Sequence, residues 1–257
     1  MTVLAVKNLS KSFGGVQAVE ALGFELAAGE LLALIGPNGA GKTTCFNMLN
    51  GQLKPDEGAV TFEGTELIGK SPRQIWRLGI GRTFQITATF ASMTVRENVQ
   101  MALISHHRRI RAFWTRAADL YVDEADALLE RVGMADQAER ACGILAYGDL
   151  KRLELAVALA HAPKLLLMDE PTAGMAPQER IELMALTADI VKERGISVLF
   201  TEHDMDVVFA HAHRVMVLNR GRLLAEGSPA EVRNDAEVQA VYLGGGSTFK
   251  GEEAEHA

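Results

Sequence analysis

A run of small and basic residues at positions 36 to 44 has the spacing of a loop that binds phosphate. Its sequence, GPNGAGKTT, meets the pattern GxxxxGK[ST] through Gly36, Gly41, Lys42 and Thr43. Glycines let successive backbone N–H groups curl around phosphate oxygens, and a helix that begins near Lys42 adds a favourable dipole. A chance match in a chain of this length has a probability of about one per cent. The stretch therefore predicts a nucleotide-binding site.

Each residue type in this loop has a predicted task. Lys42 would reach the β- and γ-phosphates, and the hydroxyl of Thr43 would sit on Mg²⁺. The residues predicted to contact the nucleotide here are Gly36, Pro37, Asn38, Gly39, Ala40, Gly41, Lys42, Thr43 and Thr44.

Two carboxylates end a second apolar run. Residues 164–168 are KLLLM, and Asp169 and Glu170 follow directly. Side chains alternate along a strand, so the two carboxylates would face different ways and divide two tasks. Asp169 would hold Mg²⁺ directly or through water, and Glu170 would polarise the water that attacks the γ-phosphate.

The apolar runs that carry these residues indicate an α/β fold. A strand, a polar tip and a helix recur along the chain, which predicts a largely parallel sheet with functional residues at the carboxyl ends of its strands. Buried strands are predicted at 31–35, 164–170 and 196–201, the last one ending at Glu202, His203 and Asp204. Other predicted elements are short strands at 4–6 and 23–26, an exposed strand at 58–64, helices at 71–79, 177–194 and 236–243, and a hairpin at 214–225.

The distribution of these elements predicts a split core. Strand signals are few between 86 and 160, which we interpret as an inserted α-helical subdomain. The nucleotide-binding core then comprises 1–85, with an N-terminal antiparallel β part, and 161–235. Residues 236–257 are predicted to form a last helix and a mobile tail.

Composition narrows the class of partner. A net charge of −7 argues against nucleic acid as the main partner, because phosphate backbones require clustered Lys and Arg. No apolar run approaches the roughly 18 residues that span a bilayer, and the N-terminus lacks the plan of a signal peptide. We therefore expect a cytoplasmic protein whose association with a membrane comes through a partner.

Five motifs in a fixed order resemble the ATPase of an ATP-binding cassette transporter. They are Walker A at 36–44, the Q-loop glutamine Gln85, the signature at 145–149, Walker B at 165–170 and the switch histidine His203. Phe13 has the spacing of the family's aromatic adenine platform. The resemblance, which covers residues 3–243, implies a P-loop NTPase fold, with ATP and Mg²⁺ as ligands and ATP hydrolysis as the activity.

The resemblance also implies roles across a dimer. In this family two cassettes face each other head to tail, so Ala146 and Gly148 of the signature would contact ATP held by the partner. His203 would contact the γ-phosphate or orient the water. Gln85 would complete the shell of Mg²⁺ and water, beside the ligands Thr43 and Asp169, and couple γ-phosphate occupancy to the helical subdomain.

Two departures from the family pattern affect contacts across the dimer. The signature is usually LSGGQ, and here it is LAYGD, so Ala146 replaces a serine whose lost contact costs on the order of 1 kcal/mol. Ala176 stands where the family usually has Asp or Asn. A different second cassette would supply the missing side chains, so we expect a heterodimer.

Three sequence motifs resemble those of the subgroup that imports branched-chain amino acids. They are LAYGD at 145–149, TEHDM around His203 and VYLG at 241–244. In that subgroup two different ATPases pair beneath two permease subunits at the inner face of the plasma membrane, supplied by a periplasmic solute-binding protein. Importers of urea or amides share many of these motifs and stay open as alternatives. A lipopolysaccharide-type transporter and a non-transport ATPase of the family also stay open.

Other enzyme classes fit the sequence less well. A GTPase needs an NKxD motif, which Asn219-Arg220-Gly221 does not supply. Cassettes of DNA repair or translation usually carry coiled coils, a second cassette or zinc cysteines, and Cys45 and Cys142 lack the spacing of a zinc site. A regulator that binds ATP without hydrolysis would not need Glu170 and His203.

Overall fold

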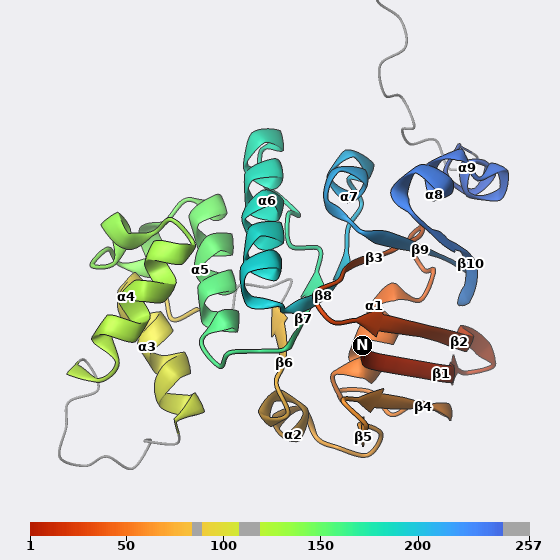
Figure 1. Cartoon of the computed structure of the whole chain (residues 1–257), viewed down its shortest axis with the longest axis horizontal. Coiled ribbons are helices and arrows are strands. Elements are labelled where there is room, and N and C mark those ends of the chain that lie inside the picture. Colours follow the sequence, from red (N-terminus) through yellow and green to blue (C-terminus); the bar gives the residue numbers. More distant parts are fainter. Residues whose placement is uncertain (84–88, 108–118, 244–257) are drawn as a thin grey trace, which may run out of the picture.

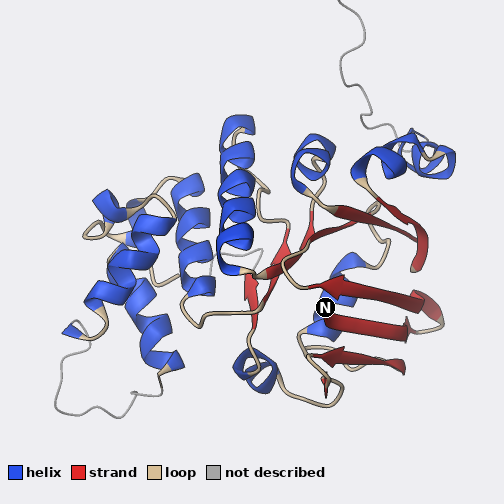
Figure 2. Ribbon diagram, in the orientation of Figure 1, coloured by secondary structure: helices blue, strands red, loops and turns tan. Residues whose placement is uncertain are grey.

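The computed structural model describes residues 1–83, 89–107 and 119–243, and Figure 1 shows how their elements are arranged. Two sheets lie beside each other, and most of the helices cover the larger one (Figure 2). The predicted site residue Gln85 and the predicted mobile tail beyond 243 lie outside the described residues.

The smaller sheet has the strand order β2-β1-β4-β5 and is antiparallel throughout. Its strands are β1 (Thr2–Phe13), β2 (Val16–Ala27), β4 (Glu57–Phe62) and β5 (Thr65–Glu66). The strands predicted at 4–6 and 23–26 were too short. The pairing of β1 with β2 contains register shifts, and Asn8 and Ala21 have positive φ, so the apolar alternation is interrupted and hides the full length of both strands.

The larger sheet has the order β10-β9-β3-β8-β7-β6 and is parallel except for β10, which pairs antiparallel with β9. Its strands are β3 (Leu31–Ile35), β6 (Ile80–Thr83), β7 (Leu165–Asp169), β8 (Ser197–Thr201), β9 (Arg214–Asn219) and β10 (Arg222–Gly227). The sequence did not predict β6, because Gly81 and Arg82 break its apolar run. The mostly parallel core and the antiparallel N-terminal part confirm the predicted fold class.

Both faces of the larger sheet are buried, which explains its continuous apolar strands. In β3, Leu31, Ala33 and Ile35 pack into a core with the helices, whereas Leu32 and Leu34 pack into a second core with the smaller sheet. Helix α1 (Lys42–Leu49) belongs to this second core, so the residues after β3 are held between the two sheets.

The remaining helices are α2 (Pro72–Arg77), α3 (Val95–His106), α4 (Val122–Arg131), α5 (Tyr147–Leu159), α6 (Pro177–Arg194), α7 (Met205–His211), α8 (Pro229–Asn234) and α9 (Ala236–Leu243), with short 3-10 turns η2 (Ala135–Gln137) and η3 (Cys142–Ile144). The helix predicted at 177–194 is confirmed at both ends, where Pro177 opens it and the left-handed Gly195 closes it. Helices α7 and α8 were not predicted, although Asp204 and Ser228 cap them with side-chain hydrogen bonds.

Helices α3, α4 and α5 pack against one another at the left of Figure 1, at the end of the larger sheet formed by β6. All three lie within the segment 86–160, whose division from the core stays a prediction. Within the described residues, no helix combines the length and the apolar character needed to cross a membrane.

Candidate functional site

The loop at 36–44 joins β3 to α1, and close packing requires two of its glycines. Gly36 has φ of 154° and Gly41 has φ of 105°. A Cβ added at Gly36 would collide with the backbone oxygen of Leu218, and one added at Gly41 would collide with that of Ala18. The glycines therefore let the loop approach β2 and the end of β9, which fixes its position.

Lys42 is buried inside this loop. Its Nζ donates to the backbone oxygen of Gly36 at 2.7 Å and to that of Pro37 at 3.3 Å. Burial lowers the pKa of Lys42, and the negative charges of Glu170 and Asp169 oppose that shift. An incoming phosphate would give the ammonium a stronger acceptor than these neutral carbonyls.

The rest of the loop presents small groups of different accessibility. Exposed are Asn38, Gly39 and Thr43; Pro37, Gly41 and Thr44 are half-buried and Ala40 is buried. Thr43 lies in the first turn of α1, next to Lys42. Phe13, at the end of β1, is 50% exposed, and the ammonium of Lys11 lies 5.6 Å from the centre of its ring. An exposed ring of this kind can stack on a planar base.

Asp169 is the last residue of β7 and lies opposite Thr201, the last residue of β8. Both of its carboxylate oxygens accept hydrogen bonds. Thr201 Oγ1 donates to Oδ1 at 2.8 Å, and Arg82 Nη2 donates to Oδ2 at 3.2 Å. The carboxylate that the sequence assigned to Mg²⁺ is therefore buried and already paired with a cationic side chain.

Glu170 leaves the strand in a left-handed conformation, with φ of 50°. Its backbone N–H donates to the backbone oxygen of Thr201 at 3.1 Å and to Oγ1 of the same residue at 3.0 Å. Asp169 and Glu170 have different partners, and the expectation that strand alternation would separate them was wrong. The strand ends at Asp169, and the turn at Glu170 rather than strand alternation separates the two carboxylates.

Glu170 and His203 lie in direct contact. Oε1 of Glu170 is 2.8 Å from Nε2 of His203, although the two residues follow different strands. The side chain of His203 is 47% exposed and that of Glu170 is 20% exposed. A carboxylate that is held by an imidazole and reached by solvent can accept a proton from water.

Glu202 is a third carboxylate at this edge, and no role was predicted for it from the sequence. It is buried, and its Oε1 accepts from the backbone N–H of Thr172 at 2.8 Å and from the hydroxyl of Thr172 at 2.7 Å. Burial raises the pKa of Glu202, while the bonds from Thr172 and from the backbone of His203 oppose the rise. Glu202 thus ties the loop after Glu170 to the loop that carries His203.

The signature forms the start of α5 and contacts the loop before α6. Ala146 is exposed and takes the N-cap position of α5, where it offers no side-chain cap. A Cβ on Gly148 would lie 2.9 Å from Oε1 of Glu179, and one on Gly174 would lie 3.1 Å from the ring of Tyr147. A side chain at position 148 would therefore displace the carboxylate of Glu179, which accepts a hydrogen bond from the backbone of Ala176.

The structure thus places the predicted residues in two groups. The phosphate loop, Asp169, Glu170 and His203 lie at the carboxyl edge of the larger sheet, whereas Ala146 and Gly148 lie at the start of α5. Gln85 lies outside the described residues. Sequence reasoning missed Arg82, Thr201 and Thr172. A polar residue at the end of a predicted buried strand was the available signal for Thr201 alone.

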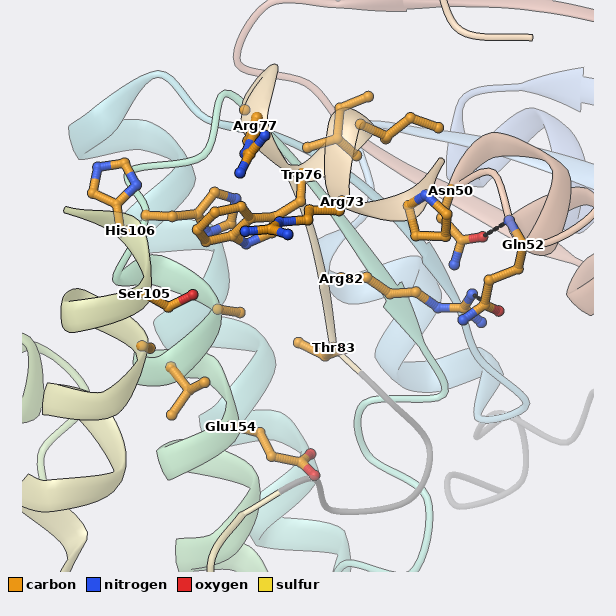
Figure 3. Close-up of a pocket in the computed structure, with 18 of the residues that line it drawn as sticks. Asn50, Gln52, Arg73, Trp76, Arg77, Arg82, Thr83, Ser105, His106 and Glu154 are labelled. Atoms are coloured by element: carbon orange, nitrogen blue, oxygen red, sulfur yellow. Dashed lines mark hydrogen bonds between the residues drawn. The ribbon is translucent and has the colours of Figure 1, made fainter. Parts of the chain in front are cut away.

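A groove of about 1110 Å³ opens beside this edge, between α2, α3, α5 and β6 (Figure 3). Trp76 of α2 stacks on His161 at the end of α5, with ring centres 4.8 Å apart. Arg73, Arg77 and Arg82 also line the groove, as Figure 3 shows. The groove is therefore part apolar and part basic.

Comparison with known proteins identifies the family. A protein-family model described as ABC transporter matches residues 19–173. A second family model, described as Branched-chain amino acid ATP-binding cassette transporter, matches residues 222–248. The high-affinity branched-chain amino acid transport ATP-binding protein LivG of Salmonella typhimurium is 40% identical over 252 residues, which cover 94% of this chain and 98% of LivG. BraF of Pseudomonas aeruginosa, a protein of the same description, is 36% identical over 252 residues, 94% of this chain and 98% of BraF.

A solved structure agrees with these relatives. The ADP conformation of MJ1267, an ATP-binding cassette of an ABC transporter, superposes with a TM-score of 0.86 at 32% identity and covers 95% of this chain and 99% of that one. The phosphate loop and the carboxylates found here lie within a cassette of this kind, and the chain belongs to the ABC transporter family as an ATP-binding cassette ATPase.

Proposed function

We propose that this ATPase drives the import of branched-chain amino acids as the nucleotide-binding subunit of a membrane transporter. Its relatives LivG and BraF are named for branched-chain amino acid transport, and residues 222–248 match a model with the same substrate in its description. The observation that best supports ATP hydrolysis is the contact between Glu170 and His203. It lies at the same edge of the sheet as Lys42, whose pKa the charges of Glu170 and Asp169 raise against the effect of burial.

Each residue at this edge has a proposed role in the reaction. Lys42 exchanges the carbonyls of Gly36 and Pro37 for the β- and γ-phosphates. Glu170 accepts a proton from the attacking water, and His203 holds Glu170 and the γ-phosphate in line. The backbone of the loop at 36–44 binds the phosphates, and Phe13 stacks on the adenine ring.

The donor chemistry of the site fits Mg²⁺. Thr43 offers a hydroxyl and Asp169 a carboxylate, both hard oxygen ligands, and Gln85 remains a proposed third ligand. Among the residues that the structure describes, no group of three His, Cys, Asp or Glu could hold a metal alone. Mg²⁺ is usually bound by one or two carboxylates together with substrate phosphates, and it neutralises charge on those phosphates.

We further propose that the groove in Figure 3 binds a cytoplasmic segment of the permease. ATPases of this family work with transmembrane permease subunits. The aromatic surface of Trp76 suits an apolar helix face, and Arg73 and Arg77 suit an acidic residue on that helix. The double variant Arg73→Glu, Arg77→Glu should sediment with permease-containing vesicles at least about tenfold less, with empty vesicles as the blank.

The proposed assembly also contains a second, different cassette, because Ala146 and Ala176 lack polar groups that act across the dimer in this family. A periplasmic solute-binding protein would deliver the amino acid from the other side of the membrane. This arrangement places the chain at the inner face of the plasma membrane.

The test is uptake of labelled leucine by cells that lack this chain. The intact chain should restore uptake, whereas Glu170→Gln should not. Uptake of urea restored in place of leucine would replace the proposed substrate. If neither is restored while purified chain still hydrolyses ATP, the import role is wrong and the ATPase assignment stands.

A further inference from the structure

Arg82 lies between the groove and the carboxylate of Asp169. Its side chain is 12% exposed, although arginine is among the residues least often buried. Nη2 donates to Oδ2 of Asp169 at 3.2 Å, and Nη1 donates to Oδ1 of Asn47 at 2.9 Å and to Oε1 of Gln52 at 3.1 Å. One guanidinium therefore connects the ends of β6 and β7 to α1 and to the residues after it.

This contact changes what Asp169 offers to a cation. Because Thr201 occupies Oδ1 and Arg82 occupies Oδ2, both oxygens are engaged by donors of the chain itself. Burial makes a lone carboxylate costly, so a positive partner stabilises Asp169 when no metal is bound. A metal ion that approached Oδ2 would meet the positive charge of the guanidinium.

Two further partners of Arg82 allow it to give up this contact. Asn47 and Gln52 are neutral amides on the segment that follows the phosphate loop, and their bonds to Nη1 do not involve Asp169. The guanidinium can therefore stay near the site when Oδ2 turns to another cation.

We propose that Arg82 is a positioning residue that competes with Mg²⁺ for Oδ2 of Asp169. It neutralises this carboxylate while the site lacks metal, which permits metal-free nucleotide to approach, and it yields the oxygen when metal arrives with the nucleotide. The inference rests on the proposed role of Asp169 as a metal ligand.

The test compares ADP affinity with and without Mg²⁺, measured by calorimetry on the full chain in magnesium and in EDTA. The magnesium ratio is the dissociation constant in EDTA divided by that in magnesium. It reports how much the metal strengthens ADP binding. Arg82→Met should weaken metal-free ADP binding, since Asp169 then repels the phosphates. The magnesium ratio should rise by at least about fivefold, the lower end of the range for coupled sites.

Two further variants separate charge from structure. Arg82→Lys keeps the positive charge but lacks the planar guanidinium with its several N–H donors. Its magnesium ratio should therefore fall between those of the wild type and Arg82→Met. Arg96→Met removes an arginine that pairs with Asp126 between α3 and α4, and its ratio should match the wild type. Circular dichroism establishes folding, and Arg82→Lys carries the test if Arg82→Met does not fold.

The outcomes distinguish this inference from the proposed function. A ratio that is unchanged in Arg82→Met, with both affinities weakened equally, would mean that Arg82 is only structural. Asp169→Asn should bring the ratio close to one. If Asp169→Asn leaves the ratio at its wild-type value, the metal role of Asp169 is wrong, and the inference about Arg82 is overturned with it.

Discussion

The carboxyl edge of the larger sheet and the start of α5 are built in opposite ways. At the sheet edge, polar side chains hold one another: Thr201 holds Asp169, His203 holds Glu170, and Glu202 holds Thr172. At the start of α5, Ala146 is exposed at an N-cap position and contributes no side-chain hydrogen bond.

This difference shows which of the two regions has its side chains paired within the single chain. At the sheet edge, Glu170 and His203 already lie in contact in the single chain, whereas Lys42 and Asp169 are bonded to groups of the chain that a ligand would have to replace. At the start of α5, the side chain at position 146 makes no capping hydrogen bond, and its contact with a second cassette stays a proposal. The four predictions below test this contrast, from the largest expected effect to the smallest.

Glu170→Gln should separate binding from hydrolysis at the sheet edge. The amide keeps the shape of the side chain but cannot accept the proton of the attacking water, so turnover should fall by at least ~10². Calorimetry should show ATP binding retained, and phosphate release measures turnover. Glu182→Gln, at an exposed pair with Arg152, is the matched control. Near-normal phosphate release in Glu170→Gln would place the base elsewhere.

Lys42→Ala should abolish measurable ATP binding, with a loss of affinity of at least ~10². The variant removes charge-assisted hydrogen bonds, each of which is worth about 1.5–3 kcal/mol. Calorimetric titration with ATP and magnesium checks the loss, and the exposed Lys54→Ala serves as control. An affinity equal to that of the wild type would contradict the assignment of the loop at 36–44.

Acid should loosen the far end of α5. Burial, together with the nearby charge of His106, lowers the pKa of His161 to about 4, whereas backbone hydrogen bonds act in the opposite sense. The folded state then binds fewer protons than the unfolded state, so stability is complete above pH 6.5 and is lost as the pH falls toward 4. Between pH 7 and 5 the loss amounts to about 2 kcal/mol.

The measurement is urea unfolding at both pH values, for the wild type and for His161→Phe. Phenylalanine keeps a ring on Trp76 but cannot titrate, so the variant should lose about 2 kcal/mol less than the wild type on acidification. The same pH dependence in both proteins would remove His161 as its cause.

Ala146→Ser should have the smallest effect, at the dimer contact. In the Glu170→Gln background with ATP, we expect a chain that is mostly monomeric and that pairs when a second, different cassette is added. A restored hydroxyl contact is worth about 1 kcal/mol, so Ala146→Ser should strengthen self-association about fivefold for each of the two contacts in a homodimer, as measured by light scattering. Ala135→Ser, at another exposed alanine, should not.

The opposite outcome is equally clear for this prediction. A tight homodimer of Glu170→Gln alone at micromolar protein, with no gain from the second cassette, would mean that pairing does not depend on a different partner. Ala146 and Ala176 would then have no role in the choice of partner.

Most of the fold could be predicted where one local signal was strong. The apolar run before Gly36 and the proline and glycine around 177–194 gave the right strand and helix, since these signals act within a few residues. Strand β6 was missed because Arg82 looks like a surface residue in the sequence. In the folded chain it is bonded to Asp169, which is 87 positions away.

The sequence by itself determined which residue types are present and at what spacing, and this was enough to predict the phosphate loop, the paired carboxylates and the histidine as site residues. Only the tertiary structure decided which of these groups touch, because parallel pairing aligns the ends of β7 and β8 and brings residues 30 to 90 positions apart within hydrogen-bond distance. Spacing along the chain carries no information about such contacts. The bond of Arg82 to Asp169 and the pairing of Glu170 with His203 therefore appear only in the folded chain.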